Sequence, residues 1–177
     1  MPGRAEYQAL LAKVESFTDR VKEGQGQWLK CGSGCGSCCH LRRTAWAVEL
    51  DAIRQLLNTL PKVQRDTIKA RLSSPEVVNG DRCVFLDNDA RCAVYGARPL
   101  ICRTHGPAVR LPNADVVWCE LNFDGMEPSV VMETISGDSI LDIELLNRTL
   151  GLINERFISV RSLVARDTLD STLTDDV

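Results

Sequence analysis

Apolar residues recur every three or four positions in four stretches of the chain, and this period predicts amphipathic helices. The expected helices cover residues 7–21, 49–57, 61–72 and 139–164. Gly24 and Gly26 end the first helix, and Pro61 can occupy the first turn of the third. Gly151 weakens the helical pattern at the centre of the last stretch.

Two short apolar runs, at residues 83–86 and 92–95, predict a β-hairpin, because the polar residues 87–90 between them have turn chemistry. A helical turn is expected after Pro99, and a further short strand at residues 116–118. The predicted fold class is therefore α+β, mostly helical, with one short β-hairpin.

Two registers of this hairpin are open. A two-residue turn at Asn88 and Asp89 pairs Phe85 with Cys92 and places Cys83 on the same face as Cys92. A slip of one residue places the two cysteines on opposite faces.

The chain of 177 residues has the length of one domain, and neither an internal repeat nor a linker divides it. We expect a single domain over residues 1–177. It contains a cysteine-rich region at 31–119, the long helix at 139–164 and a frayed acidic tail at 167–177.

The balance of 21 Lys and Arg against 24 Asp and Glu gives a net charge of −3, so no uniform basic field is present to bind nucleic acid. No apolar stretch approaches the roughly 18 residues of a membrane span. The opening residues include Arg4 and Glu6 and lack the apolar core of a secretory signal. We therefore expect a cytoplasmic protein, with neither nucleic acid nor a membrane as its partner, whose clustered thiols hold metal or do redox chemistry.

The eight cysteines fall into two blocks. The first block contains Cys31, Cys35, Cys38 and Cys39, and the second contains Cys83, Cys92, Cys102 and Cys119. Closely spaced thiolates on a loop converge on a soft metal at low entropic cost. Gly32, Gly34 and Gly36 let the backbone wrap around a bulky centre. We interpret all eight cysteines as metal ligands.

Cys38 and Cys39 are neighbours, and in an extended segment their side chains point to opposite faces. Such a pair does not suit one mononuclear ion. Two four-ligand centres with a common wall are therefore preferred, and one centre plus a thiol pair is the alternative. The only histidines, His40 and His105, flank the blocks and could bind zinc or iron, but eight thiolates suffice for two centres.

Basic residues surround both blocks and would offset the negative charge of bound thiolates. They are Lys30, Arg42, Arg43, Arg82, Arg91, Arg98, Arg103 and Arg110.

The cysteines belong to a longer motif. It reads Cys31-x3-Cys35-Gly36-x-Cys38-Cys39, then Cys83-x-Phe85-Leu86-Asp87, Cys92-x2-Tyr95, Arg98-Pro99 and Cys102-Arg103. This pattern resembles the CxxCxxCC (YkgJ-like) cysteine-cluster family over about residues 31–119. The family is described as zinc- or iron-chelating, so the resemblance implies a cysteine-rich metal-binding domain. The chain departs from it in the three-residue gap after Cys31, where the family name implies two.

Tyr95, Arg98 and Pro99 are part of the same motif. Pro99 fixes the chain direction before Cys102. Arg98 and Arg103 can donate hydrogen bonds to sulfurs or to a carboxylate such as Asp87. Tyr95 can pack beside the centre.

A metal-binding protein that holds an iron–sulfur cluster or zinc is the preferred function. Widely separated single cysteines suit a polynuclear cluster better than a compact zinc tetrahedron, so we favour iron–sulfur. Flagellin lysine N-methylases have a similar motif and are associated with an iron–sulfur centre. An S-adenosylmethionine-dependent protein N-methylase is therefore one alternative. A thiol–disulfide oxidoreductase using Cys35-x2-Cys38 is another. Catalytic and non-catalytic functions both stay open, and the apolar stripe of residues 139–164 faces either the core or a protein partner.

Overall fold

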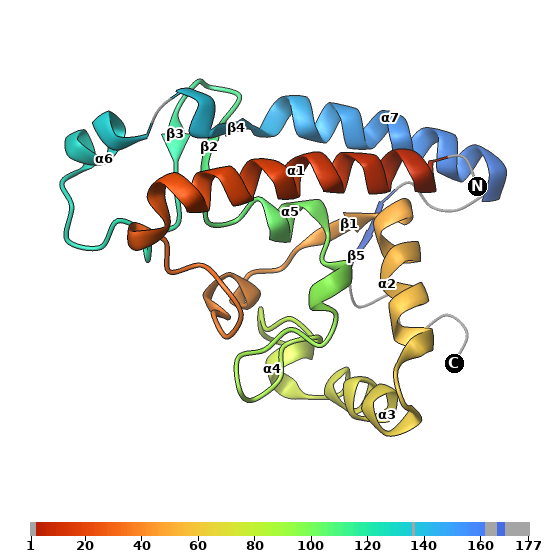
Figure 1. Cartoon of the computed structure of the whole chain (residues 1–177). Coiled ribbons are helices and arrows are strands. Elements are labelled where there is room, and N and C mark those ends of the chain that lie inside the picture. Colours follow the sequence, from red (N-terminus) through yellow and green to blue (C-terminus); the bar gives the residue numbers. More distant parts are fainter. Residues whose placement is uncertain (1–2, 136, 162–165, 169–177) are drawn as a thin grey trace.

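The computed structural model describes residues 3–135, 137–161 and 166–168, and most of its ordered elements are helices (Figure 1). The α-helices are α1 (Arg4–Gln25), α2 (Ala47–Thr59), α3 (Lys62–Arg71), α4 (Pro75–Val78), α5 (Leu100–Arg103), α6 (Pro128–Thr134) and α7 (Ile143–Arg161). The 3-10 helices are η1 (Gly26–Trp28), η2 (Ser37–His40), η3 (Tyr95–Ala97) and η4 (Gly137–Ser139). The strands are β1 (Thr44–Trp46), β2 (Ala108–Arg110), β3 (Val116–Val117), β4 (Ile140–Asp142) and β5 (Arg166–Thr168). The predicted mostly helical α+β class is confirmed.

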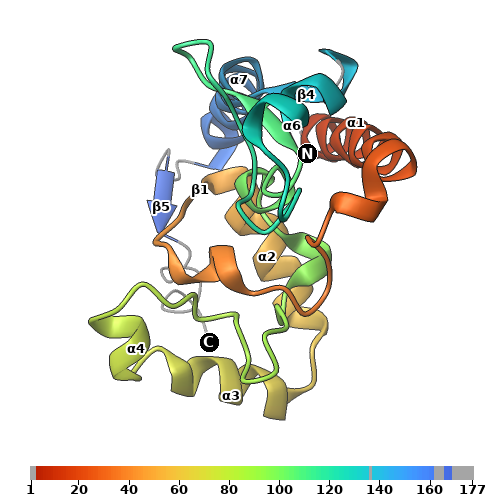
Figure 2. The ribbon, with the colours of Figure 1, turned by 90° about the vertical axis from the view of Figure 1, so that its left-hand side faces the viewer.

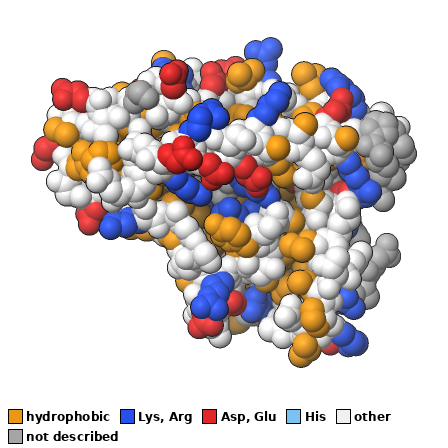
Figure 3. Space-filling model, in the orientation of Figure 1, with side chains coloured by type: hydrophobic (Ala, Val, Ile, Leu, Met, Phe, Trp, Pro, Cys, Tyr) orange, Lys and Arg blue, Asp and Glu red, His pale blue; other side chains and the backbone are white. Residues whose placement is uncertain are grey.

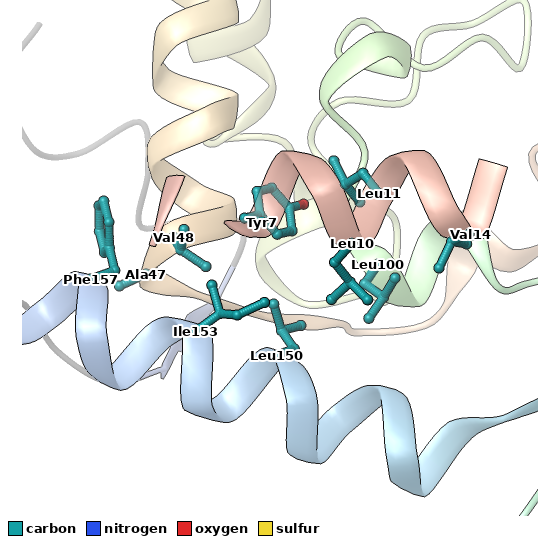
Figure 4. Close-up of a cluster of buried hydrophobic side chains, with 10 residues drawn as sticks. All are labelled: Tyr7, Leu10, Leu11, Val14, Ala47, Val48, Leu100, Leu150, Ile153 and Phe157. Atoms are coloured by element: carbon teal, nitrogen blue, oxygen red, sulfur yellow. The ribbon is translucent and has the colours of Figure 1, made fainter. Parts of the chain in front are cut away.

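Helices α1, α2 and α7 bury their apolar faces against one another, and α5 closes the same cluster (Figure 4). The cluster contains Tyr7, Leu10, Leu11, Val14, Ala47, Val48, Leu100, Leu150, Ile153 and Phe157. Gly3 begins α1 with a φ of 82°, and a Cβ there would lie 2.8 Å from the Cβ of Phe157. Glycine therefore lets the start of α1 lie directly on α7.

The first three predicted helices are present with small shifts at their ends. Helix α1 ends at Gln25, between the two glycines expected to stop it, and Pro61 immediately precedes α3. Helix α2 begins two residues earlier than predicted. The side chain of Glu49 accepts the backbone N–H of Trp46 at 2.8 Å and satisfies a donor at the helix start.

The last predicted helix begins later than expected. Residues 140–142 form strand β4, and α7 starts at Ile143. These residues pair with β2, and an extended ladder excludes helical hydrogen bonds. Gly151 lies within a continuous helix, where an added Cβ would come 3.8 Å from the ring of Trp46. Residues 162–164 of the predicted helix lie outside the described residues.

Two small sheets tie distant segments together. Strand β2 lies between β3, which is antiparallel to it, and β4, which is parallel to it. The strand predicted at 116–118 is confirmed as β3. Strand β1 pairs antiparallel with β5, with Thr44 opposite Thr168. We expected a frayed tail from residue 167, but Asp167 and Thr168 lie in this ladder. Residues 169–177 lie outside the described residues.

Helices α3 and α4 form a second layer with the segment that carries Cys83 and Cys92. Figure 2 shows the orange segment after α1 passing between this layer and the layer of α1 and α7. The segment with the first four cysteines thus lies where the two layers meet.

A tight antiparallel turn takes the place of the predicted hairpin strands. Its one bridge joins Leu86 to Cys92, so the pairing is shifted by one residue from the register with Phe85 opposite Cys92. The turn is longer than the two residues assumed for that register. Ala90 adopts a φ of 58°, and the Asp87 carboxylate accepts two backbone N–H groups of the turn, at 2.9 and 2.7 Å.

Candidate metal centre

The first cysteine block folds as two consecutive tight turns after α1. The N–H of Cys35 donates to the carbonyl of Gly32 at 3.1 Å, and the N–H of Cys39 donates to that of Gly36 at 2.9 Å. Turns of this kind reverse the chain within a few residues, so cysteines close in sequence can face a common space.

Cys38 and Cys39 do not point to opposite faces, which corrects the prediction made for an extended segment. Both lie in the 3-10 helix η2, where neighbouring side chains diverge by about a third of a turn. Each side chain shifts the pKa of the other, and both line the same cavity.

The second block reaches the first through the backbone. The N–H of Cys83 donates to the carbonyl of Cys39 at 2.8 Å. Cys92 lies at the bridge opposite Leu86, and Cys102 lies in the helical turn α5, as predicted. Cys119 follows β3, and its carbonyl accepts the N–H of Asn122 at 2.8 Å.

The two blocks meet around a cavity of about 50 Å³. Seven of the eight cysteines line it: Cys31, Cys35, Cys38, Cys39, Cys83, Cys92 and Cys102. All eight cysteines are free thiols, and each is partly buried. Among the described residues, no group of three or more Cys, His, Asp or Glu side chains is arranged so that it could hold a metal ion. The thiols therefore surround a space instead of meeting at one point.

Burial and mutual repulsion raise the pKa of several thiols in this cavity. Desolvation is the main cause for Cys31, whose pKa rises to about 11 with further contributions from Cys35, Cys119 and Cys38. Desolvation also raises the pKa of Cys102 to about 12, and Cys83 adds to it. Several thiolates in the cavity at the same time are therefore unfavourable unless a bound cation offsets their charge.

Cys38 behaves in the opposite way. Interaction with the Cys39 thiol is the main cause that lowers the pKa of Cys38 to about 6, and Arg43 and Arg98 contribute to this value against the effect of burial. The same interaction raises the pKa of Cys39. Cys38 is therefore the thiol of the pair that loses its proton more readily.

Arg98 is the cation most closely tied to the cysteine cavity. It lines the cavity and lowers the pKa of Cys31, Cys38 and Cys92. Its guanidinium carbon lies 3.6 Å from the centroid of the Tyr95 ring, a cation–π contact that keeps the charge in place. This confirms that Tyr95 packs beside the cysteines.

Arg103 does not reach Asp87, which corrects one of the contacts suggested by the motif. It donates to the carbonyls of Arg98 at 2.8 Å and Gly96 at 2.7 Å, and it forms an ion pair with Glu15. Arg103 thus fixes the chain before α5 and does not supply charge to a carboxylate in the turn.

Acidic and basic side chains lie next to one another on the face of the molecule shown in Figure 3. Near the cysteines, several arginines already have a carboxylate as ion-pair partner. Arg82 pairs with Glu76 at 3.3 Å and Arg42 with Asp81 at 3.9 Å. Arg43 has no carboxylate within ion-pair distance in the part of the chain described here, and its hydrogen bond is to His105.

His105 is held by other groups. Arg43 can only donate, so His105 Nε2 accepts its hydrogen bond at 3.0 Å, and the ring also bonds to the backbone of Ile101. Burial and Arg43 lower the pKa of His105, so the ring is neutral. The carbonyl of His105 accepts the Cys31 thiol at 3.4 Å. His40 is exposed and does not line the cysteine cavity.

Three residues that position the cysteines were not singled out from the sequence. Asn122 accepts the N–H of Lys30 at 2.8 Å and donates to the carbonyl of Gly106 at 2.6 Å. Gly106 has a φ of 118° and lies against Cys31. Glu49, buried at 2 % exposure, accepts the N–H of Leu100 at the start of α5 at 2.7 Å. Each acts through long-range contacts that leave no local pattern.

The match to a known family agrees with this geometry. The model of the CxxCxxCC family, described as "Putative zinc- or iron-chelating domain", matches residues 30–120, just over half of the chain and a range that contains all eight cysteines. No curated protein and no solved structure matches the chain. Among the described residues, no helix has both the length and the apolar character needed to cross a membrane. On the strength of the matched range, the chain belongs to the CxxCxxCC family of zinc- or iron-chelating domains.

Proposed function

We propose that the chain holds metal through its eight cysteines, as an iron–sulfur centre in preference to zinc, and that it serves a redox-related function. The meeting of seven cysteines around one small cavity carries this proposal. Burial raises the pKa of Cys31, Cys92 and Cys102 there, and a bound cation would stabilise their deprotonated forms. The family description supports the choice of zinc or iron.

The mutual effects of the thiols support a division into two sets of four. Cys35, Cys119 and Cys38 raise the pKa of Cys31, and these four cysteines form the first set. Cys39, Cys83, Cys92 and Cys102 form the second, since Cys83 and Cys92 raise the pKa of both Cys39 and Cys102. Cys38 influences both sets, as a residue on a common wall would.

The preference for iron–sulfur rests on how the thiols are spread. They surround a cavity, and no group in the described residues is close enough to hold a single ion as it stands. A polynuclear cluster spans more space than a zinc ion with sulfur ligands at about 2.3 Å. Such a centre would supply one-electron transfer.

Elemental analysis and visible absorption of protein purified without oxygen test the proposal. We expect iron, acid-labile sulfide and broad visible absorption. Zinc without colour would select the alternative metal and a structural centre. Protein with neither metal would refute the proposal.

Serine substitutions test whether the cysteines are ligands. Cys35→Ser and Cys38→Ser are expected to lose metal and to be less stable. Ser37→Ala is the matched control, because Ser37 is exposed in the same loop. Metal content that is unchanged in both cysteine variants would show that the assignment is wrong.

The division into two sets has its own test. Cys119→Ser and Cys92→Ser each remove one member of a different set, so each is expected to lose about half of the metal. Wild-type metal content in Cys119→Ser would exclude Cys119 from the ligands.

One observation favours thiol–disulfide exchange as a second candidate. Cys38 lies next to Cys39 in the lining of the cysteine cavity, and interaction with Cys39 lowers its pKa to about 6. Its sulfur could attack a substrate disulfide and form a mixed disulfide, and Cys39 could then displace the substrate as a dithiol, which leaves a Cys38–Cys39 disulfide. Metal-free protein that reduces a model disulfide, with the activity lost in Cys38→Ser, would support this candidate.

A further inference from the structure

A second cavity, of about 190 Å³, adjoins the cysteine cavity. The two have four cysteines in common: Cys38, Cys39, Cys83 and Cys102. A molecule bound in the second cavity would therefore contact these four cysteines. It would not contact Cys31, Cys35 or Cys92, which line only the cysteine cavity. Four of its lining residues are proposed metal ligands, but its aliphatic side chains and its arginines are not, and these call for a separate explanation.

The walls of this cavity are mostly apolar, and its size suits a small organic molecule. Leu41, Val77 and Ile101 contribute aliphatic surface from three different segments. An apolar cavity of about 150 Å³ is enough to hold benzene. A ligand with a body of that size, plus one polar group, fits the space.

The charges on the walls select the polar group. Arg42 and Arg82 also line the cavity, but each already has an ion-pair partner, Asp81 at 3.9 Å and Glu76 at 3.3 Å. The carboxylate in the lining of the cavity is therefore that of Asp81, and its ion-pair partner is Arg42.

Arg43 is different. It is half-buried and lacks a carboxylate partner among the described residues. One of its N–H groups is used on the His105 ring, and its charge also acts on the Cys38 thiol. A guanidinium has five N–H donors in a planar fork, so enough remain to hold a carboxylate with two hydrogen bonds.

We propose that the cavity lined by Leu41, Val77, Ile101 and Arg43 binds a small carboxylate with an apolar body, beside the cysteine centre. The carboxylate pairs with Arg43, and the apolar body fills the space between the aliphatic walls. The proposal goes beyond metal binding, because it assigns a ligand class to a site next to the metal-binding cysteines.

Calorimetric titration of the full chain, as purified and with its metal content measured, tests this with three probes of one shape. Benzoate, benzyl alcohol and benzylamine carry a negative, a neutral and a positive group. We expect benzoate to bind at least about tenfold more tightly than benzyl alcohol, because its carboxylate forms charge-assisted hydrogen bonds. Equal affinities, tighter binding of benzylamine, or no binding of benzoate would overturn the proposal.

Two arginine variants locate the carboxylate. Arg43→Gln is expected to lose about tenfold in benzoate affinity and to leave benzyl alcohol binding unchanged. Arg42→Gln is the matched control, because Arg42 lines the same cavity but is paired with Asp81, and it should bind benzoate like the wild type. Equal losses in both variants would contradict the role of Arg43.

The outcome is separate from that of the metal proposal. Protein without metal that still prefers benzoate would support the ligand site and refute the metal centre. Protein with metal that ignores benzoate would do the reverse. The three-probe comparison also decides the matter in wild-type protein if Arg43→Gln does not fold.

Discussion

Cys31 packs so closely on Gly106 that the glycine has no room for a side chain. A Cβ at position 106 would lie 2.8 Å from the Cβ of Cys31 and 2.9 Å from its sulfur, and the φ of 118° is one that other residues rarely adopt. We expect Gly106→Ala to displace Cys31, to reduce metal content and to lower the free energy of unfolding by about 2 kcal/mol. Metal analysis and urea unfolding measure the two effects.

Gly96→Ala is the control for this substitution. Nothing lies within 4 Å of a Cβ at Gly96, and its φ is outside the left-handed region. Its metal content should equal that of the wild type. Equal behaviour of the two variants would show that the contact with Cys31 is unimportant.

Asn122 fixes the same corner from the other side, through its hydrogen bonds to Lys30 and Gly106. It is buried, so Asn122→Ala leaves a backbone donor and a backbone acceptor without their partner. We expect a loss of about 1–3 kcal/mol in the free energy of unfolding, measured in urea. Asn147→Ala, on the exposed surface of α7, should change stability by less than about 0.5 kcal/mol.

The raised pKa values of Cys31, about 11, and Cys102, about 12, make metal binding dependent on pH. Both thiols are protonated at neutral pH, and a metal ion must displace their protons. Apparent zinc affinity should therefore rise by about tenfold or more per pH unit between pH 6.5 and 8. Cys38, with a pKa of about 6, adds little above pH 7. Competition with a chelator of known pH dependence measures this, and a constant affinity would contradict it.

At the scale of elements, Glu49 joins the start of α2 to the start of α5. One carboxylate oxygen accepts the N–H of Trp46, and the other accepts the N–H of Leu100. In Glu49→Gln the amide nitrogen cannot accept, so one buried N–H loses its partner. We expect a loss of about 2 kcal/mol in stability.

Glu155→Gln, exposed on α7, is the control for this substitution and should unfold like the wild type. Calorimetric or urea unfolding distinguishes the two variants. Because α5 carries Cys102, a reduced metal content in Glu49→Gln alone would tie this contact to the cysteine site.

Elements that bury one face over many residues could be predicted, and short ones could not. The period of apolar residues in α1, α2 and α7 reflects packing in one cluster, so the sequence contains the signal directly. Strands β1, β2, β4 and β5 have three residues each, too few for an alternating pattern. They form because distant segments meet, as Ile140 does with Ala108.

At the scale of the whole molecule, the meeting of the two cysteine blocks could be predicted but its arrangement could not. The spacing indicated that the cysteines gather, and their role as metal ligands stays a prediction. The common cavity depends on the turn at Asp87 and on the 3-10 helix that turns Cys38 and Cys39 to one side. Both are short local turns, in which a residue or two decides the register.

Metal removal should affect the molecule as a whole, because the cysteine region lies between the helical layers. Chelation is expected to lower the midpoint of thermal unfolding by about 5 °C or more, in a single transition. Restoring the metal should restore the midpoint. Circular dichroism during heating measures this, and a midpoint independent of metal would show that the centre does not support the fold.

The hydrogen bond between Cys39 and Cys83 also sets an order of events during synthesis. The first four thiols are made well before the second four, and the last cysteine is residue 119 of 177. A growing chain that ends before this point has only part of the site, and its glycine-rich loop has no opposing wall. A centre built across this contact can therefore be completed only late in translation. Until then the early thiols lack the side chains from the second block that would complete the cavity.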